Sequence, residues 1–174
     1  MGMSNDKNFD YVVMGAGSAG CILAGKLSED PNVKVLILEA GGQDTDPLIQ
    51  IPLGMGKMHE YRMHDWGFDT EAEEKLNGRI IEAMRGKVIG GSSSINVMAY
   101  VRGHRGDYDR WAQKGCQNWS YTDVLPYFQR GESWEGGEDA YRGGSGPIST
   151  QLIKNKDPLL TDWAQSCVEA GYQL

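Results

Sequence analysis

The sequence lacks the features of a protein that binds nucleic acid or crosses a membrane. Its 17 Lys and Arg residues are outnumbered by 24 Asp and Glu residues, which gives a formal net charge of −7. No basic run could neutralise a row of phosphates, and no apolar run approaches the roughly 20 residues that a bilayer span requires. We therefore expect neither nucleic acid nor a membrane among its partners.

Cysteine and histidine are also scarce. The cysteines are odd in number and far apart, which is not the pattern of a disulfide framework, and their apolar or helical surroundings predict reduced, buried thiols: Cys21, Cys116 and Cys167. None of the three histidines has a second His or Cys at metal-ligand spacing, so we expect no metal site.

The composition is that of a soluble globular protein. The 174 residues are 40% hydrophobic, enough for one domain with a sizeable core. The first eight residues are polar and lead directly into an apolar run, a pattern that does not indicate a secretory signal. We expect a cytoplasmic location.

Residues 9–38 predict a βαβ unit, and hence an α/β fold. Residues 9–14 (FDYVVM) form a β-rich apolar run, a glycine-rich turn follows at 15–20, and the next residues have helical periodicity. Asp30 and Pro31 end the helix. A second continuous apolar run at 33–38 is typical of a strand buried in a parallel sheet.

The fingerprint turn, residues 15–20, has the spacing of a dinucleotide-binding motif between a strand and a helix. Gly15 permits the tight turn, Gly17 lets the backbone approach a pyrophosphate, and Gly20 allows close packing of helix and strand. Glu39 ends the second strand, where a carboxylate accepts hydrogen bonds from a ribose diol and disfavours NADP. The turn alone does not distinguish FAD from NAD.

The rest of the chain predicts shorter elements. Residues 41–70, here called the excursion, lose all periodicity and are expected to pack over another part of the molecule. Trp66 lies in the excursion and is interpreted as a packing residue. Asn77-Gly78 predicts a tight hairpin between residues 70–76 and 79–84.

Three helices and a loop are expected beyond residue 100. Residues 108–114 and 123–130 predict two short helices, the second capped by Thr122. Residues 135–147 contain five glycines and predict a flexible loop. Asp157 and Pro158 have the pattern of a cap and first residue of a final helix.

A second motif distinguishes FAD from NAD as the expected cofactor. The serine loop, residues 86–96 (GKVIGGSSSIN), is followed by Tyr100, Gly103 and Asp109. In this order the residues resemble the first signature of the glucose-methanol-choline oxidoreductases. The resemblance implies a Rossmann-like FAD-binding domain of that type, incomplete in this chain. Residues 1–174 would be its N-terminal part, with the excursion covering the cofactor and with the substrate domain and C-terminal catalytic segment outside the chain.

The two motifs together give the predicted cofactor-binding residues. The first group comes from the fingerprint turn and the second strand: Gly15, Gly17, Ser18, Ala19, Gly20, Glu39 and Ala40. The second group follows from the resemblance: Val88, Gly91, Ser92, Asn96, Val97, Met98 and Ala99. Some relatives attach FAD covalently through a histidine where this sequence has Ile95, so non-covalent FAD is expected.

The resemblance implies oxidation of a small-molecule alcohol by hydride transfer to the flavin. The catalytic base of the family lies near the end of a longer chain, so His104 is interpreted as structural and no catalytic residue is predicted here. The remaining part of the enzyme, as a second polypeptide, is the expected partner, because two parallel strands alone leave uncovered sheet edges.

Two alternatives stay open. Some members of the family use the FAD scaffold for lyase chemistry on cyanohydrins, and their N-terminal halves would look the same. A nucleotide-binding chain without chemistry, as one part of a split assembly, is also compatible with these residues.

Overall fold

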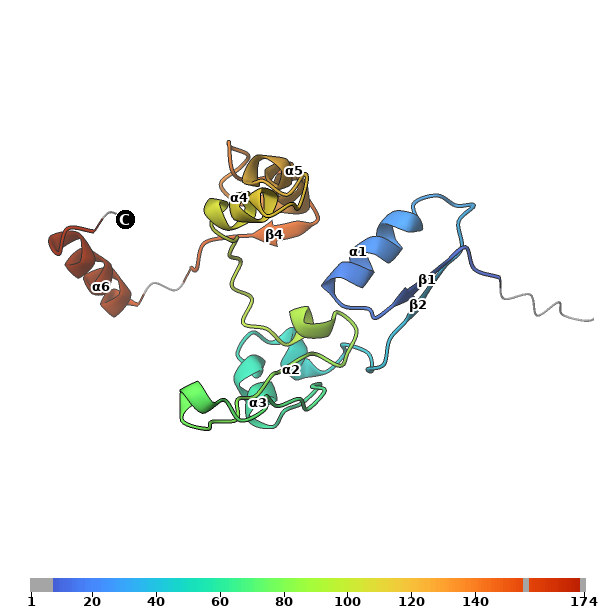
Figure 1. The fold of residues 1–174 in the computed structure, drawn as a ribbon, viewed down its shortest axis with the longest axis horizontal. Helices are drawn as coiled ribbons and strands as arrows, with labels where there is room; N and C mark the ends of the chain where they lie inside the picture. Colours follow the sequence, from blue (N-terminus) through green and yellow to red (C-terminus); the bar gives the residue numbers. More distant parts are fainter. Residues whose placement is uncertain (1–7, 155–156, 173–174) are drawn as a thin grey trace, which may run out of the picture. The chain divides into compact units, whose positions relative to one another are not determined.

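The computed structural model describes residues 8–154 and 157–172. The chain divides into two compact units, Met1–Ala99 and Tyr100–Leu174. Figure 1 follows the elements along the chain. The first unit contains the two glycine-rich motifs, and the second contains the helices expected beyond residue 100.

The first unit begins with the predicted βαβ arrangement. Strand β1 (Tyr11–Met14) pairs in parallel with β2 (Val35–Leu38), and helix α1 (Ser18–Leu27) connects them. The register places Met14 beside Leu38, so both strands end at the same level. The predicted order of elements is confirmed, although each strand begins two residues later than its apolar run.

The excursion packs on the serine loop. Asp46 caps the short helix α2 (Pro47–Gln50), and helix α3 (Gly54–Glu60) follows. The serine loop contains the 3₁₀ turn η2 (Gly91–Ser94). Side chains from both segments form a small core of three buried residues, Met58, Val88 and Ile95, with five partly buried residues around them: Leu48, Ile49, Met55, Met63 and Met84.

The hairpin is confirmed as a turn but not as two regular strands. Asn77 and Gly78 have φ values of 60° and 69°, as the tight turn requires. Only isolated bridges, such as Asp69 with Glu82, join the flanking segments. The 3₁₀ turn η1 (Glu74–Leu76) interrupts the first segment, where the Glu73 carboxylate accepts a hydrogen bond from the backbone N–H of Lys75.

Two capped helices start the second unit. Helix α4 (Arg105–Gln113) is capped by His104, whose Nδ1 accepts a hydrogen bond from the Gly106 N–H at 3.1 Å. Helix α5 (Tyr121–Gly131) is capped by Ser120, with Asp123 completing a capping box. The cap predicted at Thr122 is therefore wrong, because the helix begins two residues earlier and Thr122 lies inside its first turn.

Two parallel strands enclose the glycine-rich loop. Strands β3 (Glu132–Trp134) and β4 (Ile148–Thr150) pair in parallel. Between them the Asp139 carboxylate accepts hydrogen bonds from the backbone N–H groups of Tyr141 and Arg142 and fixes a turn. The final helix α6 (Pro158–Glu169) starts at the predicted Asp157 cap.

A buried carboxylate on β3 links β4 to two arginines of the second unit. The side chain of Glu132 is fully buried and lies 2.6 Å from both Arg102 and Arg142. The Thr150 hydroxyl donates to it at 2.6 Å. Burial alone would raise the pKa of Glu132, but these donors and the two guanidinium groups outweigh burial and lower it.

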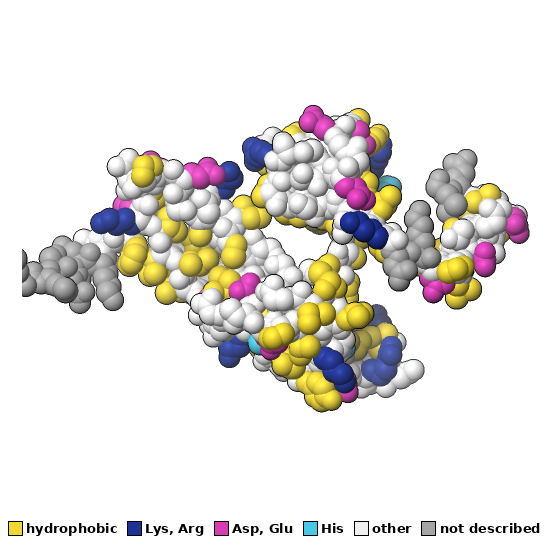
Figure 2. Space-filling view, turned by 180° about the vertical axis from the view of Figure 1, so that it is seen from behind, with side chains coloured by type: hydrophobic (Ala, Val, Ile, Leu, Met, Phe, Trp, Pro, Cys, Tyr) yellow, Lys and Arg dark blue, Asp and Glu magenta, His cyan; other side chains and the backbone are white. Residues whose placement is uncertain are grey.

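Large apolar side chains remain exposed on the βαβ unit. Val12 is 55% exposed, Met14 86% and Leu23 55%. Figure 2 shows apolar side chains gathered over this part of the molecule. Cys21 and Cys116 are also exposed, so the predicted burial of these two thiols is wrong. In the parts of the chain that the structure describes, no helix is long and apolar enough to span a bilayer.

Candidate functional site

The two glycine-rich motifs meet directly, backbone against backbone. Gly90 donates its N–H to the Ala16 carbonyl at 2.7 Å, and Gly17 and Gly90 form a parallel bridge. A Cβ on Gly91 would lie 2.9 Å from the Cα of Gly17. Gly90 and Gly91 have φ values of 88° and 58°, the left-handed region that favours glycine. A side chain on Gly91 would therefore prevent the serine loop from approaching Gly17 this closely.

A nucleotide pocket of about 550 Å³ lies at this junction. It adjoins the carboxyl ends of β1 and β2 and the N-terminus of α1, which is where open parallel sheets bind their ligands. Its lining comes from the strand ends, the fingerprint turn, the excursion and the serine loop: Met14, Gly15, Gly17, Leu38, Glu39, Ala40, Trp66, Gly86 and Gly91.

The fingerprint turn leaves the start of α1 free for an anion. Gly15 has a φ of 92°, and a Cβ on Gly20 would lie 1.9 Å from the Gly15 carbonyl oxygen. Glycine at both positions therefore allows the helix to start tightly against the strand. No side chain caps α1 and no acid occupies its first turn. The first N–H groups and the positive end of the helix dipole suit a diphosphate.

The Glu39 carboxylate joins the fingerprint turn to the chain that leaves β2. One oxygen accepts the Ala16 N–H at 2.7 Å, and the other accepts the Gly41 N–H at 2.8 Å. The Gly41 and Ala16 hydrogen bonds lower the pKa of Glu39, against a smaller opposing effect of burial. The carboxylate is ionised at neutral pH, as recognition of a ribose diol requires.

The serine loop is fixed from both sides. The Ser92 hydroxyl accepts the Gly86 N–H at 3.0 Å, and Ile89 donates its N–H to the Gly42 carbonyl at 2.9 Å. A Cβ on Gly41 would lie 2.1 Å from the Lys87 carbonyl carbon, so this contact also requires glycine.

Trp66 lines the nucleotide pocket, although the sequence placed it among packing residues. Its ring stacks on Phe68 with centroids 5.8 Å apart and planes 4° apart. The Lys87 ammonium lies 4.8 Å from the centroid of the Trp66 ring. Tryptophans in loops pack more often than they bind a ligand, and for this reason the sequence predicted a packing role for Trp66. The position of its ring beside the fingerprint turn depends on the fold and has no local sequence signal.

The structure brings five of the predicted residues together in the pocket lining: Gly15, Gly17, Glu39, Ala40 and Gly91. Ser18 and Ala19 are exposed at the start of α1, Gly20 is buried behind it, and Ser92 stabilises the loop. Val88 is fully buried in the core and does not belong to the pocket lining. The run 96–99 is separate from this lining: Asn96 and Met98 line a second cavity, and Val97 and Ala99 are exposed.

The sequence prediction missed three further lining residues. Met14 and Leu38 are the last residues of their strands, and the rule that ligands bind outside the carboxyl ends of parallel strands could have identified them. A Cβ on Gly86 would lie 2.3 Å from the Gly91 carbonyl carbon, a contact that has no local sequence signal. Within residues 8–154 and 157–172, no cluster of His, Cys, Asp and Glu forms a metal site.

Known proteins match almost the whole of this chain. A model of the GMC oxidoreductase family matches residues 9–174. The oxygen-dependent choline dehydrogenase of Vibrio vulnificus (strain YJ016) is 48% identical over 169 residues, which cover 95% of this chain and 30% of that protein. The chain therefore spans about 30% of the length of the curated relatives it matches.

Solved structures agree with the sequence matches. Pyridoxine 4-oxidase from Mesorbium loti has a TM-score of 0.86 at 37% identity, over 93% of this chain and 32% of that one. An FAD-dependent oxidoreductase from Chaetomium thermophilum has a TM-score of 0.80 at 30% identity, over 93% of this chain and 29% of that one. Each match leaves roughly two thirds of the longer protein without a counterpart in this chain.

Proposed function

The chain belongs to the GMC oxidoreductase family, and from this premise we propose that it forms the FAD-binding part of an enzyme that oxidises an alcohol. The observation that carries the proposal is the backbone contact between Gly17 and the serine loop beside the strand ends. Through this contact, the dinucleotide fingerprint and the family's signature motif line the same pocket.

The residues present fit FAD. No protein atom lies within 4 Å of the place where a Cβ on Gly17 would stand, so the backbone there is open to a diphosphate. Glu39 would receive the adenosine ribose, and the start of α1 would receive the diphosphate. By the family resemblance, residues 96–99 would lie beside the isoalloxazine ring.

This chain would bind and orient the cofactor, and another part would supply the base. Bound FAD supplies the acceptor for a hydride that leaves the carbinol carbon as the hydroxyl proton passes to a base. His104 is already used as the cap of α4. We therefore place the base outside the chain, in the remaining part of the enzyme, which would be the partner of the exposed apolar surface on the βαβ unit.

Binding of the flavin is proposed to be non-covalent. Ile95 is only 7% exposed and packs in the core with Met58 and Val88. An alkyl side chain has no nucleophilic atom that could bond to the flavin. The test is acid precipitation of the flavin-loaded enzyme: free flavin in the supernatant supports the proposal, and flavin that stays with the protein contradicts it.

An absorption spectrum taken before and after anaerobic addition of primary alcohols tests the proposed function, together with the intact mass. We expect flavin bands that bleach with alcohol, and a mass above that of this chain or a second polypeptide. Flavin that is never reduced by an alcohol but splits a cyanohydrin would support the lyase alternative. Preparations without flavin would contradict the cofactor assignment.

A further inference from the structure

One wall of the nucleotide pocket is a short antiparallel pair of segments. Backbone hydrogen bonds and an isolated bridge join residues 64–66 of the excursion to residues 85–87, which begin the serine loop. Trp66 and Gly86 belong to these segments, and both line the nucleotide pocket. The paired segments are here called the pocket wall.

The pocket wall begins at a residue with a strained backbone. His64 has a φ of 56°, in the left-handed region that residues with a side chain rarely adopt. Its carbonyl accepts the Lys87 N–H at 2.6 Å, which is the first hydrogen bond of the wall. A conformation of this kind persists only where surrounding contacts fix it. The contacts of the His64 side chain therefore bear on the position of the wall.

The His64 side chain contacts a carboxylate that is distant in sequence. Its Nε2 lies 2.9 Å from Oδ2 of Asp46, and the two side chains are 24% and 23% exposed. The hydrogen bond from His64 lowers the pKa of Asp46, with a further contribution from the Leu48 N–H. The carboxylate is therefore ionised at neutral pH.

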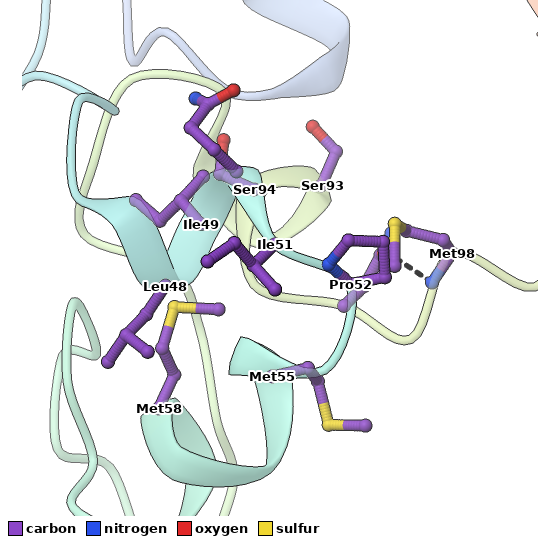
Figure 3. A pocket seen from close by; sticks show the side chains of 11 residues that line it. Leu48, Ile49, Ile51, Pro52, Met55, Met58, Ser93, Ser94 and Met98 are labelled. Atoms are coloured by element: carbon purple, nitrogen blue, oxygen red, sulfur yellow. Dashed lines mark hydrogen bonds between the residues drawn. The ribbon is translucent and has the colours of Figure 1, made fainter.

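The same carboxylate is fixed to the core of the first unit. Oδ1 of Asp46 accepts the Leu48 N–H at 2.8 Å and caps α2. Leu48 and Ile49 pack against the buried core that the excursion forms with the serine loop. Figure 3 shows them beside Ser93 and Ser94, around a cavity of about 170 Å³. The Asp46–His64 pair thus connects the pocket wall to a helix start that packs on the core.

From this geometry we infer that His64 and Asp46 are positioning residues for the cofactor: their pair fixes the pocket wall, and the fixed wall slows the release of FAD. The inference rests on the proposed function and deepens it. Neither residue lines the nucleotide pocket, so both act through the backbone of residues 64–66. Contacts that order a binding site in advance reduce the cost of binding, and such differences in affinity are expressed mostly in the dissociation rate.

The experiment measures how fast FAD leaves the complete enzyme, from the free flavin that appears after dilution. His64→Leu leaves the mostly buried Asp46 carboxylate without its donor, and we expect release to become about tenfold faster. His64→Gln can still donate an amide N–H to Asp46 and should stay within about threefold of the unaltered enzyme. Equal rates for the two variants would overturn the inference, because the hydrogen bond would then not matter.

His59 supplies the matched control. Its Nε2 lies 3.7 Å from a carboxylate oxygen of Glu82, and the two side chains are 60% and 45% exposed. Exposed pairs of this kind contribute little, so His59→Leu should change the release rate by less than about twofold. An increase as large as that of His64→Leu would show a general effect of altering the excursion and would overturn the inference.

A double-variant cycle tests the pair itself. Serine also caps helices, so Asp46→Ser keeps an acceptor for the Leu48 N–H but removes the carboxylate that His64 contacts. We expect Asp46→Ser to release FAD about as fast as His64→Leu, and the double variant to release it no faster, because both changes remove the same bond. Effects that multiply in the double variant would mean that the two residues act separately, which contradicts the inference.

Hydrogen exchange distinguishes failure of this inference from failure of the proposed function, because it requires no alcohol and no bound flavin. His64→Leu should speed exchange of the Lys87 N–H about tenfold. The Gly15 N–H, which donates to Leu38 in the βαβ unit, should exchange as before. This result would support the positioning role even if no alcohol were oxidised. Unchanged exchange at Lys87 would overturn it even in an active alcohol oxidoreductase.

Discussion

At the scale of single residues, glycines determine whether the nucleotide pocket can form. The glycines of the fingerprint turn were identifiable from sequence because their requirements are local: a turn, a helix start and a strand end at fixed spacing. Val88 was assigned to the cofactor by resemblance, but it is fully buried. Burial depends on segments distant in sequence, here Met58 of the excursion, and no local pattern reports it.

Two glycines of helix α1 give opposite predictions. Gly20→Ala would place a Cβ 1.9 Å from the Gly15 carbonyl oxygen, whereas at Gly25 no atom lies within 4 Å. We expect Gly20→Ala to destabilise the enzyme by about 1–3 kcal/mol and to weaken FAD binding at least tenfold. Gly25→Ala should stabilise it by about 0.5–1 kcal/mol. Chemical denaturation and FAD titration measure both, and similar effects of the two changes would contradict the geometry.

Glu39 predicts a dependence of stability on pH. Its folded-state pKa is lowered, so its contribution is fully present above the ordinary carboxyl pKa and is lost as the pH falls through the lowered value. Glu39→Gln leaves one of two N–H groups without an acceptor and should cost about 1–3 kcal/mol at pH 7. The loss should shrink on acidification in denaturation experiments.

Glu29 supplies the control for this change. Its ion pair with Lys26 joins side chains that are 64% and 69% exposed, and such pairs contribute about 0–1 kcal/mol. Glu29→Gln should therefore leave both the stability at pH 7 and its pH profile nearly unchanged. If the stability of Glu39→Gln depended on pH in the same way as that of the unaltered protein, the Glu39 carboxylate would not stabilise the fingerprint turn.

At the scale of elements, the order was predictable and the ends were not. Apolar runs, the fingerprint turn and the Asp157-Pro158 pair placed β1, α1, β2 and α6 in their observed order. Helix ends depend on which of several neighbouring polar residues makes the capping bond. Ser120 and Thr122 both have side chains that can cap a helix. Helix α5 starts at Tyr121, directly after Ser120, because the Asp109 carboxylate of α4 accepts a hydrogen bond from the Tyr121 N–H at 2.9 Å.

The cap of α5 can be tested with that pair. Ser120 makes the capping box with Asp123, whereas Thr122 lies inside the helix. We expect Ser120→Ala to cost about 1 kcal/mol of stability and Thr122→Ala to stay within about 0.5 kcal/mol, as measured by denaturation. A larger loss of stability from Thr122→Ala than from Ser120→Ala would show that Thr122 is the cap, as the sequence predicted.

The buried carboxylate of β3 connects several elements of the second unit. Glu132→Gln would leave Arg102 and Arg142 without a counter-charge, and breaking a buried ion pair in this way costs about 3–5 kcal/mol. Hydrogen exchange should show faster opening within residues 100–154 and little change in residues 8–99. Glu138 is exposed in the loop between β3 and β4, so Glu138→Gln should alter exchange in neither unit.

At the scale of the whole molecule, the boundary after Ala99 is marked by no shift in composition, so local sequence patterns do not predict it. Contiguous exposed apolar surface indicates a surface that binds another protein segment. The second apolar run was predicted to be a buried strand, but Ile37 and Leu38 of β2 are 37% and 50% exposed, whereas parallel sheets are usually covered on both faces.

The exposed face of α1 therefore predicts opposite effects in two preparations. Leu23 is 55% exposed in this chain. Leu23→Ser should reduce self-association and binding of an apolar dye by the isolated 174 residues, but it should lower the stability of the complete enzyme by about 2 kcal/mol or more. Ultracentrifugation and denaturation measure the two effects. A complete enzyme unaffected by the change would mean that the remaining part does not cover α1.

The contact between Gly17 and Gly90 also has a consequence for biosynthesis. Both glycines, and every residue that lines the nucleotide pocket, lie within Met1–Ala99. A ribosome adds about 5–20 residues per second, so the pocket can close on the emerging chain while Tyr100–Leu174 is still being made. The whole lining of the pocket is therefore synthesised before the second unit is complete.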